Sequence, residues 1–215
     1  MDVDRFVAEL PGRFENYPES ELPTDPRFAE VLEQVPGLAR PNNLALINLA
    51  ASLLEPGESY VEVGTFRGTS LISALLDNDG DFVGIDDFSM GDGNREQLDA
   101  NLDRFGLTGR ATVVEGDAFD VLPAGALGER KVGVYYYDAA HDYRSQVEGL
   151  RMVQPWLAPR AMLLVDDTDW EDVGRATRDY VAAQPRARLV LELPGDDEGR
   201  PQWWKGMMAL GWEAE

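Results

Sequence analysis

From residue 58 onward, short apolar runs alternate with longer stretches whose apolar residues recur at helical spacing. Five runs rich in β-branched and aromatic residues predict strands, at 60–63, 82–86, 111–115, 132–138 and 161–166. The stretches that follow them predict helices, at 70–76, 95–105, 117–122, 143–156 and 173–183. Such alternation is typical of parallel βαβ units, in which helices cover both faces of one sheet.

Two further apolar runs, 188–193 and 206–212, predict a closing pair of strands. The loop that joins them contains Asp196, Asp197 and Gly199. We therefore predict an α/β fold with a Rossmann-like, mostly parallel sheet of seven strands. Helices should lie on both faces, and the last strand should be antiparallel.

The length of the chain, 215 residues, suits a single domain, because domains usually contain about 100–200 residues. We expect residues 44–215 to form the Rossmann-like core. Residues 1–43 should form an N-terminal helical cap that packs on the same sheet. The apolar residues that suggest a helix in the cap are Phe28, Val31, Leu32 and Val35.

Three features of the composition limit where the protein works. No apolar run approaches the roughly 18 residues that a membrane span needs. The N-terminus lacks the basic start and apolar stretch of a secretory signal. The chain has no cysteine, which excludes disulfides, thiolate metal sites and a cysteine nucleophile. We expect a cytoplasmic protein, and the composition leaves a homo-oligomer open.

The charge is unusual, since 40 acidic residues against 19 basic ones give a net charge of −21. Such a surface repels phosphate backbones and anionic membranes, so we expect neither nucleic acid nor membrane as a partner. It attracts cations, including divalent metal ions. A general gain in solubility, or adaptation to a saline cytoplasm, explains the same charge without any specific site.

The first motif, YVEVGTFRGTS at 60–70, is an apolar strand that runs into a glycine-bearing turn and then a helix. Gly64 and Gly68 let the main chain approach a ligand closely. The dinucleotide fingerprint G-x-G-x-x-G is absent, and Glu62 precedes the turn. A pyrophosphate would be repelled by Glu62, whereas a cationic ligand without phosphate would not. The alternative is a tight strand–helix turn without a ligand.

The second motif is an acid at the end of the next predicted strand. Asp86 lies 22 residues after Gly64, close to the interval of about 20 at which an acid binds the ribose diol in dinucleotide folds. The alternative role is a helix N-cap, which Asp87 fits better. In parallel sheets, ligands bind at the carboxyl ends of the strands. The acids at predicted strand ends locate the active site there: Glu62, Asp86, Asp138, Asp166 and Asp167.

With these motifs, residues 44–193 resemble a class I S-adenosylmethionine-dependent methyltransferase, of the group of macrocin-type and catechol-type O-methyltransferases. The resemblance implies that Glu62, Gly64 and Gly68 line the methionine part of the cofactor and that Asp86 holds the ribose. It also implies that Gly116, Asp117 and Ala118 lie near the adenine. The further residues that we assign to the cofactor are Thr65, Ser70 and Asp138.

The third motif, YYYDAAHDY at 135–143, resembles the D-x-x-H-x-Y signature of the macrocin-like group. In catechol-type enzymes the metal-ligating Asp is followed, three residues later, by a lysine that deprotonates the substrate. Here that position holds His141, the only histidine in the chain. Imidazole titrates near neutrality and can accept a hydroxyl proton. We expect Asp138 and His141 to be catalytic; the alternative for His141 is a structural role.

The fourth motif is LLVDDTDW at 163–170, in which Asp166 and Asp167 end an apolar strand. Two adjacent carboxylates are costly to bury together without a cation. With Asp138 they form an all-oxygen set, which suits Mg²⁺, Ca²⁺ or Mn²⁺ better than zinc. In catechol-type enzymes the corresponding pair is Asp-Asn. The alternative is N-capping of the next helix, for which Asp167 or Asp169 would suffice.

The motifs together predict an S-adenosylmethionine-dependent O-methyltransferase. We expect its substrate to be a hydroxylated small molecule, a sugar or a phenol, with intermediates of secondary metabolism among the candidates. Magnesium would assist the transfer. Two alternatives stay open, a nicotinamide-dependent oxidoreductase and a non-catalytic cofactor-binding protein of the same fold. Three tryptophans are candidates for lining the substrate pocket or packing the core: Trp170, Trp203 and Trp204.

Overall fold

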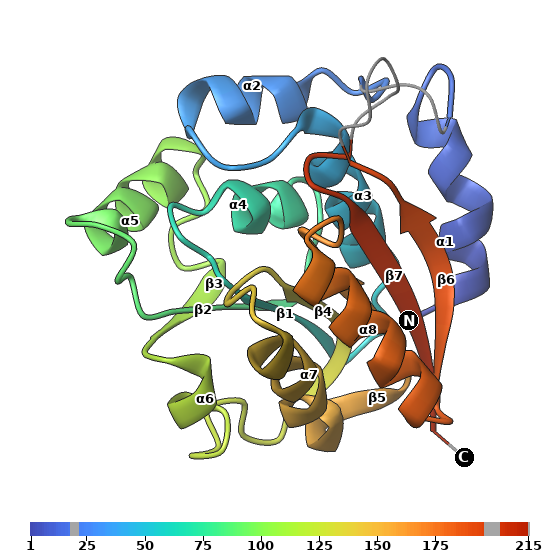
Figure 1. The fold of residues 1–215 in the computed structure, drawn as a ribbon. Coiled ribbons are helices and arrows are strands. Elements are labelled where there is room, and N and C mark those ends of the chain that lie inside the picture. The colour runs from blue at the N-terminus through green and yellow to red at the C-terminus, as the bar shows by residue number, and fades with distance from the viewer. Residues whose placement is uncertain (18–21, 196–202, 215) are drawn as a thin grey trace.

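The computed structural model describes residues 1–17, 22–195 and 203–214, and Figure 1 shows a twisted sheet with helices on both faces. The strands are β1 (Glu58–Val63), β2 (Asp81–Asp86), β3 (Ala111–Glu115), β4 (Lys131–Tyr137), β5 (Leu157–Val165), β6 (Ala187–Leu193) and β7 (Met207–Glu213). Their order in the sheet is β3-β2-β1-β4-β5-β7-β6. The last strand, β7, is antiparallel to β5 and β6, so the predicted fold is confirmed. The predicted loop with Asp196, Asp197 and Gly199 lies outside the described residues.

The helices form two layers. The α-helices are α1 (Val3–Glu9), α2 (Arg27–Gln34), α3 (Pro41–Ser52), α4 (Thr69–Leu75), α5 (Asn94–Arg104), α6 (Ala118–Val121), α7 (Tyr143–Met152) and α8 (Glu171–Ala183), with 3-10 turns η1 (Leu10–Arg13) and η2 (Gln154–Trp156). Apolar residues of α1 to α5 share one core with one face of the sheet. Those of α6 to α8 share a second core with the opposite face.

The largest differences from the predicted boundaries are four residues, and they occur at two places. The helix predicted at 143–156 ends at Met152, because Pro155 cannot continue an α-helix and lies in η2 instead. The strand predicted from residue 161 begins at Leu157, which pairs with Val132 before the register shifts. Both differences arise at the edge of the sheet away from the candidate site.

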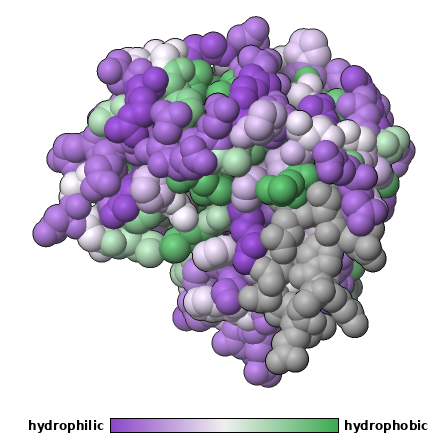
Figure 2. Space-filling model, turned by 90° about the horizontal axis from the view of Figure 1, so that it is seen from above, coloured by the Kyte–Doolittle hydropathy of each residue, from purple (hydrophilic) through white to green (hydrophobic). Residues whose placement is uncertain are grey.

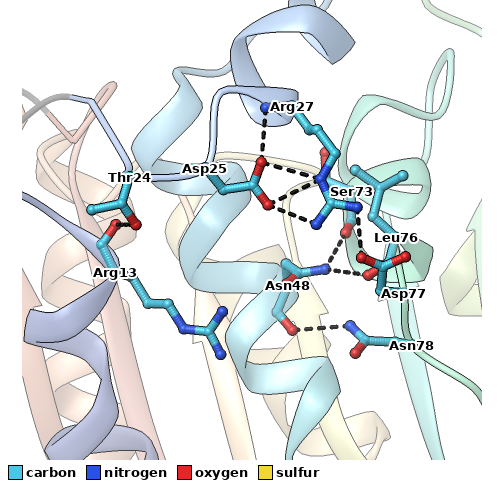
Figure 3. A network of polar contacts seen from close by, with 9 residues as sticks. All are labelled: Arg13, Thr24, Asp25, Arg27, Asn48, Ser73, Leu76, Asp77 and Asn78. Carbon is cyan, nitrogen blue, oxygen red and sulfur yellow. Dashed lines mark hydrogen bonds and ion pairs between the residues drawn. The ribbon is translucent and has the colours of Figure 1, made fainter.

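The N-terminal helices are fixed to the core by a network of polar contacts around α4 (Figure 3). The guanidinium of Arg27 lies 2.7 Å from Asp25 and 2.6 Å from Asp77, which follows α4. The amide of the buried Asn48, on α3, donates to the carbonyl oxygens of Ser73 and Leu76. These bonds give side-chain partners to carbonyls in the last turn of α4, where the hydrogen bonds within the helix run out. They hold the helix that begins at the glycine turn of β1.

Figure 2 shows the molecule from above the view of Figure 1, the side on which α2 lies. Hydrophobic residues gather near the middle of this face, and hydrophilic residues cover much of the area around them. The acids predicted at strand ends lie where the parallel strands end, since Asp86 ends β2 and Asp138 and Asp166 directly follow β4 and β5. None of the described helices is long and apolar enough to span a membrane.

Candidate active site

The turn between β1 and α4 passes close to the end of β4. Gly64 has φ +95°, and a Cβ there would overlap the carbonyl oxygen of Asp138. Gly68, with φ +91°, precedes the first residue of α4, and a Cβ there would crowd Leu98. Other residues are disfavoured at both positions by conformation and by space. The turn therefore brings main chain directly beside Asp138.

Glu62 is fully buried on the face of β1 that also carries Tyr60, which packs in the core shared with α1 to α5. Its Oε2 accepts a hydrogen bond from the hydroxyl of Tyr60 at 2.7 Å, and its Oε1 accepts one from Ser70 at 3.2 Å. Burial raises the pKa of Glu62 to about 8. Ser70, in the first turn of α4, and the buried Thr65, in the loop before it, were both assigned to the cofactor from sequence, and both lie close to Glu62.

Asp86 connects the turns that follow β1 and β2. Its carboxylate accepts the backbone N–H groups of Phe66, at 2.7 Å, and of Phe88, at 2.6 Å. Each carboxylate oxygen has a second lone pair, so the group can still accept a hydrogen bond from a ribose hydroxyl. Burial raises the pKa of Asp86 above its ordinary value.

The residues predicted near the adenine lie beside Asp86, at the end of β3. The N–H of Gly116 donates to the carbonyl oxygen of Asp86 at 2.9 Å. Asp117 is exposed and caps α6, because its carboxylate accepts the N–H of Phe119 at 2.8 Å. Ala118 is buried in the first turn of that helix.

Three side chains converge between the ends of β4 and β5. Asp138, His141 and Asp167 each place one ligand atom so that all three lie within 4.8 Å of one another. His141 Nε2 lies 2.9 Å from Asp167 Oδ2 and 3.8 Å from Asp138 Oδ1. Asp167 Oδ1, the other oxygen of that carboxylate, is buried and makes no hydrogen bond. Orphaned polar atoms of this kind are typical of a site that holds an ion or a water.

Asp166, the third predicted metal ligand, is turned away from this group. Its Oδ2 accepts the hydroxyl of Tyr136 at 2.5 Å, and its Oδ1 accepts the N–H of Asp167 at 2.9 Å. Burial and the neighbouring carboxylates hold the pKa of Asp166 well above its ordinary value. The structure therefore brings Asp138 and Asp167 together with His141, which we expected to act only as a base.

The electrostatics of His141 follow from its two acidic neighbours. The carboxylates of Asp138 and Asp167 raise the pKa of the imidazole to about 10. The ring of Trp170 lies against it, with 4.5 Å between ring centroids, and 47% of Trp170 is exposed. Trp203, by contrast, is buried against Phe14. Of these two candidates for lining the substrate pocket, only Trp170 stands open beside the site.

Sequence reasoning missed two tyrosines that contact the acids. Tyr60 lies two residues before Glu62, and Tyr136 lies two residues before Asp138. Residues two apart on a strand point to the same face, so the strand pattern carried a signal for both. Both tyrosines are buried and bond to carboxylates of the site.

A family model described as a methyltransferase domain matches residues 61–168, which is half of the chain. The chain belongs to this family. The matched residues extend from β1 into the turn after β5, so they include both Glu62 and Asp167. No curated protein matches the sequence significantly.

Solved structures with the same fold include O-methyltransferases. The O-methyltransferase from Bacillus cereus in complex with SAH (S-adenosylhomocysteine) has 16% identity, covering 99% of this chain and 100% of that one, with a TM-score of 0.66. TomG from Streptomyces achromogenes, involved in tomaymycin synthesis and solved in complex with SAM (S-adenosylmethionine), has 17% identity over 100% of both chains and a TM-score of 0.68. CalS11, a TDP-rhamnose 3'-O-methyltransferase of calicheamicin biosynthesis, has 20% identity, 99% and 93% coverage and a TM-score of 0.57.

Family and fold together identify an S-adenosylmethionine-dependent methyltransferase of class I. The resemblance inferred from the motifs is thereby confirmed. This assignment rules out the alternative of a nicotinamide-dependent oxidoreductase, which the sequence had left open.

Proposed function

We propose that this methyltransferase transfers the methyl group of S-adenosylmethionine to a hydroxyl oxygen of a small molecule, assisted by a divalent cation. The observation that carries the proposal is the group of Asp138, His141 and Asp167 beside the glycine turn of β1. The backbone of Asp138 lies so close to Gly64 that a cofactor on the turn and an ion on the group would be neighbours. Bringing two reactants together in this way supplies much of the rate in bimolecular transfers.

The cofactor would lie along the ends of β1, β2 and β3. The methionine part would be bound by Glu62 of β1, by Gly64, Thr65 and Gly68 of the turn that follows, and by Ser70 of α4. Asp86 would accept hydrogen bonds from the ribose, and the segment 116–118 would lie against the adenine. The support for this placement is that the backbone of Gly116 bonds to Asp86 and that the carboxylate of Asp86 bonds to the turn after β1.

The residues present fit a divalent cation. Two carboxylates and one imidazole converge, and Asp167 Oδ1 is buried without a hydrogen-bond partner. Oxygen donors favour Mg²⁺, Mn²⁺ or Ca²⁺. Asp138 and Asp167 would hold the ion, and Asp166 would support them from its bonds to Tyr136 and to the backbone of Asp167. A bound ion would lower the pKa of the substrate hydroxyl.

His141 would accept the proton of the substrate hydroxyl. With a pKa of about 10, its imidazole carries a proton at neutral pH beside two unneutralised carboxylates. A divalent cation on Asp138 and Asp167 would oppose that effect. His141 would therefore act as a base only in the metal-loaded protein.

The acceptor would be a hydroxylated metabolite, a sugar or a phenol. TomG and CalS11, which share the fold, are described as enzymes of natural-product synthesis, and CalS11 as acting on a sugar nucleotide. The exposed ring of Trp170 beside His141 offers an apolar surface for such an acceptor. The net charge of −21 opposes nucleic acids and anionic membranes, and we expect the enzyme to act in the cytoplasm.

The test is transfer of labelled methyl from S-adenosylmethionine to a panel of catechols and sugars with vicinal diols. We expect EDTA to abolish transfer and Mg²⁺ to restore it in the parent protein. Asp138→Asn should lose this restoration, because it removes a charged ligand. The control is Asp142→Asn, an exposed position that caps α7 and where Asn caps equally well.

Two outcomes would separate the parts of the proposal. Full turnover after exhaustive chelation would contradict the metal and leave methyl transfer standing. Binding of S-adenosylhomocysteine without transfer to any acceptor would favour the non-catalytic alternative.

A further inference from the structure

Three consecutive tyrosines, Tyr135, Tyr136 and Tyr137, are buried on β4. Successive side chains of a strand point to opposite faces of the sheet. Tyr135 and Tyr137 belong to the core beneath α7 and donate to backbone carbonyl oxygens of Gly149 and Ser145. Tyr136 belongs to the opposite core, and its hydroxyl reaches the acidic edge of the sheet.

The hydroxyl of Tyr136 lies between two carboxylates. It is 2.5 Å from Asp166 Oδ2 and 3.3 Å from Asp138 Oδ2. The other oxygen of Asp166 accepts the N–H of Asp167 at 2.9 Å. The carboxylate of Asp166 therefore connects the tyrosine to the backbone of the residue that faces His141.

This connection bears on the conformation of Asp167. Asp167 has φ +55°, a left-handed conformation that costs free energy in a residue other than glycine and that its surroundings must hold in place. The N–H bond to Asp166 is made by this strained residue, and Asp166 is itself held by Tyr136. From this conformation Asp167 places its Oδ2 2.9 Å from His141 Nε2.

We infer that Tyr136 is a positioning residue of the proposed cation site, acting through Asp166 on the turn that carries Asp167. The inference rests on the proposed function. Groups that hydrogen-bond to metal ligands fix the orientation of those ligands, and their loss typically lowers metal affinity by roughly 10–100-fold. In the metal-free protein, Asp166 then links the hydroxyl of Tyr136 to the backbone N–H of Asp167. This link explains why its side chain faces the tyrosine.

The experiment compares Tyr136→Phe with Tyr135→Phe. Each removes one buried hydroxyl from neighbouring positions of β4, but only Tyr136 contacts the acids. The dissociation constant of Mn²⁺, measured by calorimetry, should rise roughly 10–100-fold in Tyr136→Phe and stay near the parent value in Tyr135→Phe. Affinity for S-adenosylhomocysteine should be alike in both variants and in the parent.

Should Tyr136→Phe not fold, Asp166→Asn and Asp166→Leu give a second measurement. The amide oxygen of Asn can still accept the Tyr136 hydroxyl, whereas Leu cannot. We expect Mn²⁺ affinity in Asp166→Asn to stay closer to the parent value than in Asp166→Leu. Equal losses in these two variants would contradict a role for the Tyr136–Asp166 bond.

Unchanged or tighter Mn²⁺ binding in Tyr136→Phe would overturn the inference while leaving the cation site in place. A parent protein that binds no Mn²⁺ would remove the cation site and the inference together. S-adenosylhomocysteine binding and methyl transfer by that parent would still stand, so the two failures are distinguishable.

Discussion

Glu62 and Asp86 stand at the ends of adjacent strands, yet their surroundings differ. Asp86 is partly exposed and accepts two backbone N–H groups, which stabilise its charge. Glu62 is fully buried among side-chain hydroxyls, and burial raises its pKa to about 8. The folded protein therefore favours a protonated Glu62 at neutral pH when no cationic ligand is bound.

This difference predicts a pH dependence of stability. Between the ordinary pKa of a glutamate and about 8, folded Glu62 holds a proton that the unfolded chain has lost. Stability therefore falls as pH rises through this window, by up to about 1.4 kcal/mol per pH unit. Glu62→Gln cannot titrate, so its melting temperature relative to the parent should increase from pH 5 to pH 9. Differential scanning calorimetry of the cofactor-free proteins measures this.

The matched control is Glu129→Gln, since Glu129 is exposed in the loop before β4. Its melting temperature relative to the parent should not depend on pH in this window. A Glu62→Gln difference that is flat with pH would show that Glu62 is ionised throughout.

At the level of elements, the turn between β1 and α4 depends on one close approach. Gly64 packs directly on the carbonyl of Asp138. The turn that would bind the cofactor can therefore lie against the end of β4 only because Gly64 has no side chain. The turn after β5 is joined to β7 in a similar way, because Thr168 N–H donates to Gly206 O and Asp169 N–H donates to Lys205 O. Both turns are held by backbone contacts between strands distant in sequence.

Gly64→Ala should therefore disturb both parts of the site. The added Cβ must displace the backbone of Asp138, which costs stability and weakens Mn²⁺ binding together. Gly57→Ala is the control, because Gly57 has a similar φ of +85° but nothing within 4 Å of an added Cβ. It should cost only the conformational strain, about 1–2 kcal/mol, and leave Mn²⁺ affinity unchanged. Equal losses in urea unfolding for the two variants would contradict the packing argument.

For the whole molecule, repulsion between like charges is the main long-range interaction, because the net charge is −21. Ion pairs on the surface, such as Arg175 with Asp172, are too few to balance 40 acidic residues. Like charges over a compact surface repel, and dissolved salt screens that repulsion at separations beyond about 10 Å at 0.1 M. The folded state therefore gains more from salt than the expanded unfolded chain does.

We expect the melting temperature at pH 7 to rise by a few degrees between 0.05 M and 1 M KCl, as followed by circular dichroism. The control is the same titration near pH 4.3, the isoelectric point calculated from the sequence, where the net charge is close to zero. There the salt should have a much smaller effect. An equal rise at both pH values would assign the effect to general salting-out and not to charge repulsion.

The order of strands and helices along the chain predicted much of the fold, because apolar residues repeat at different spacings in strands and in helices. The placement of the site followed because parallel strands end at one edge of the sheet. The acids Glu62, Asp86, Asp138 and Asp166 could be assigned to that edge before any coordinates. The position of β7 between β5 and β6 could not be predicted from the sequence, because it depends on pairing between distant strands and not on a local pattern. The bound ligands, the acceptor and the assignment of site residues stay predictions.

By itself the sequence determined which residues stand at the carboxyl ends of the strands, because each apolar run stops there, and which face each strand residue occupies, because side chains alternate with a period of two. Only the tertiary structure decided which of those side chains contact one another. It turned Asp166 toward Tyr136 and brought His141 to Asp138 and Asp167. Those choices depend on side-chain rotamers and on the left-handed backbone of Asp167, and they are set by packing between strands that the local sequence does not encode.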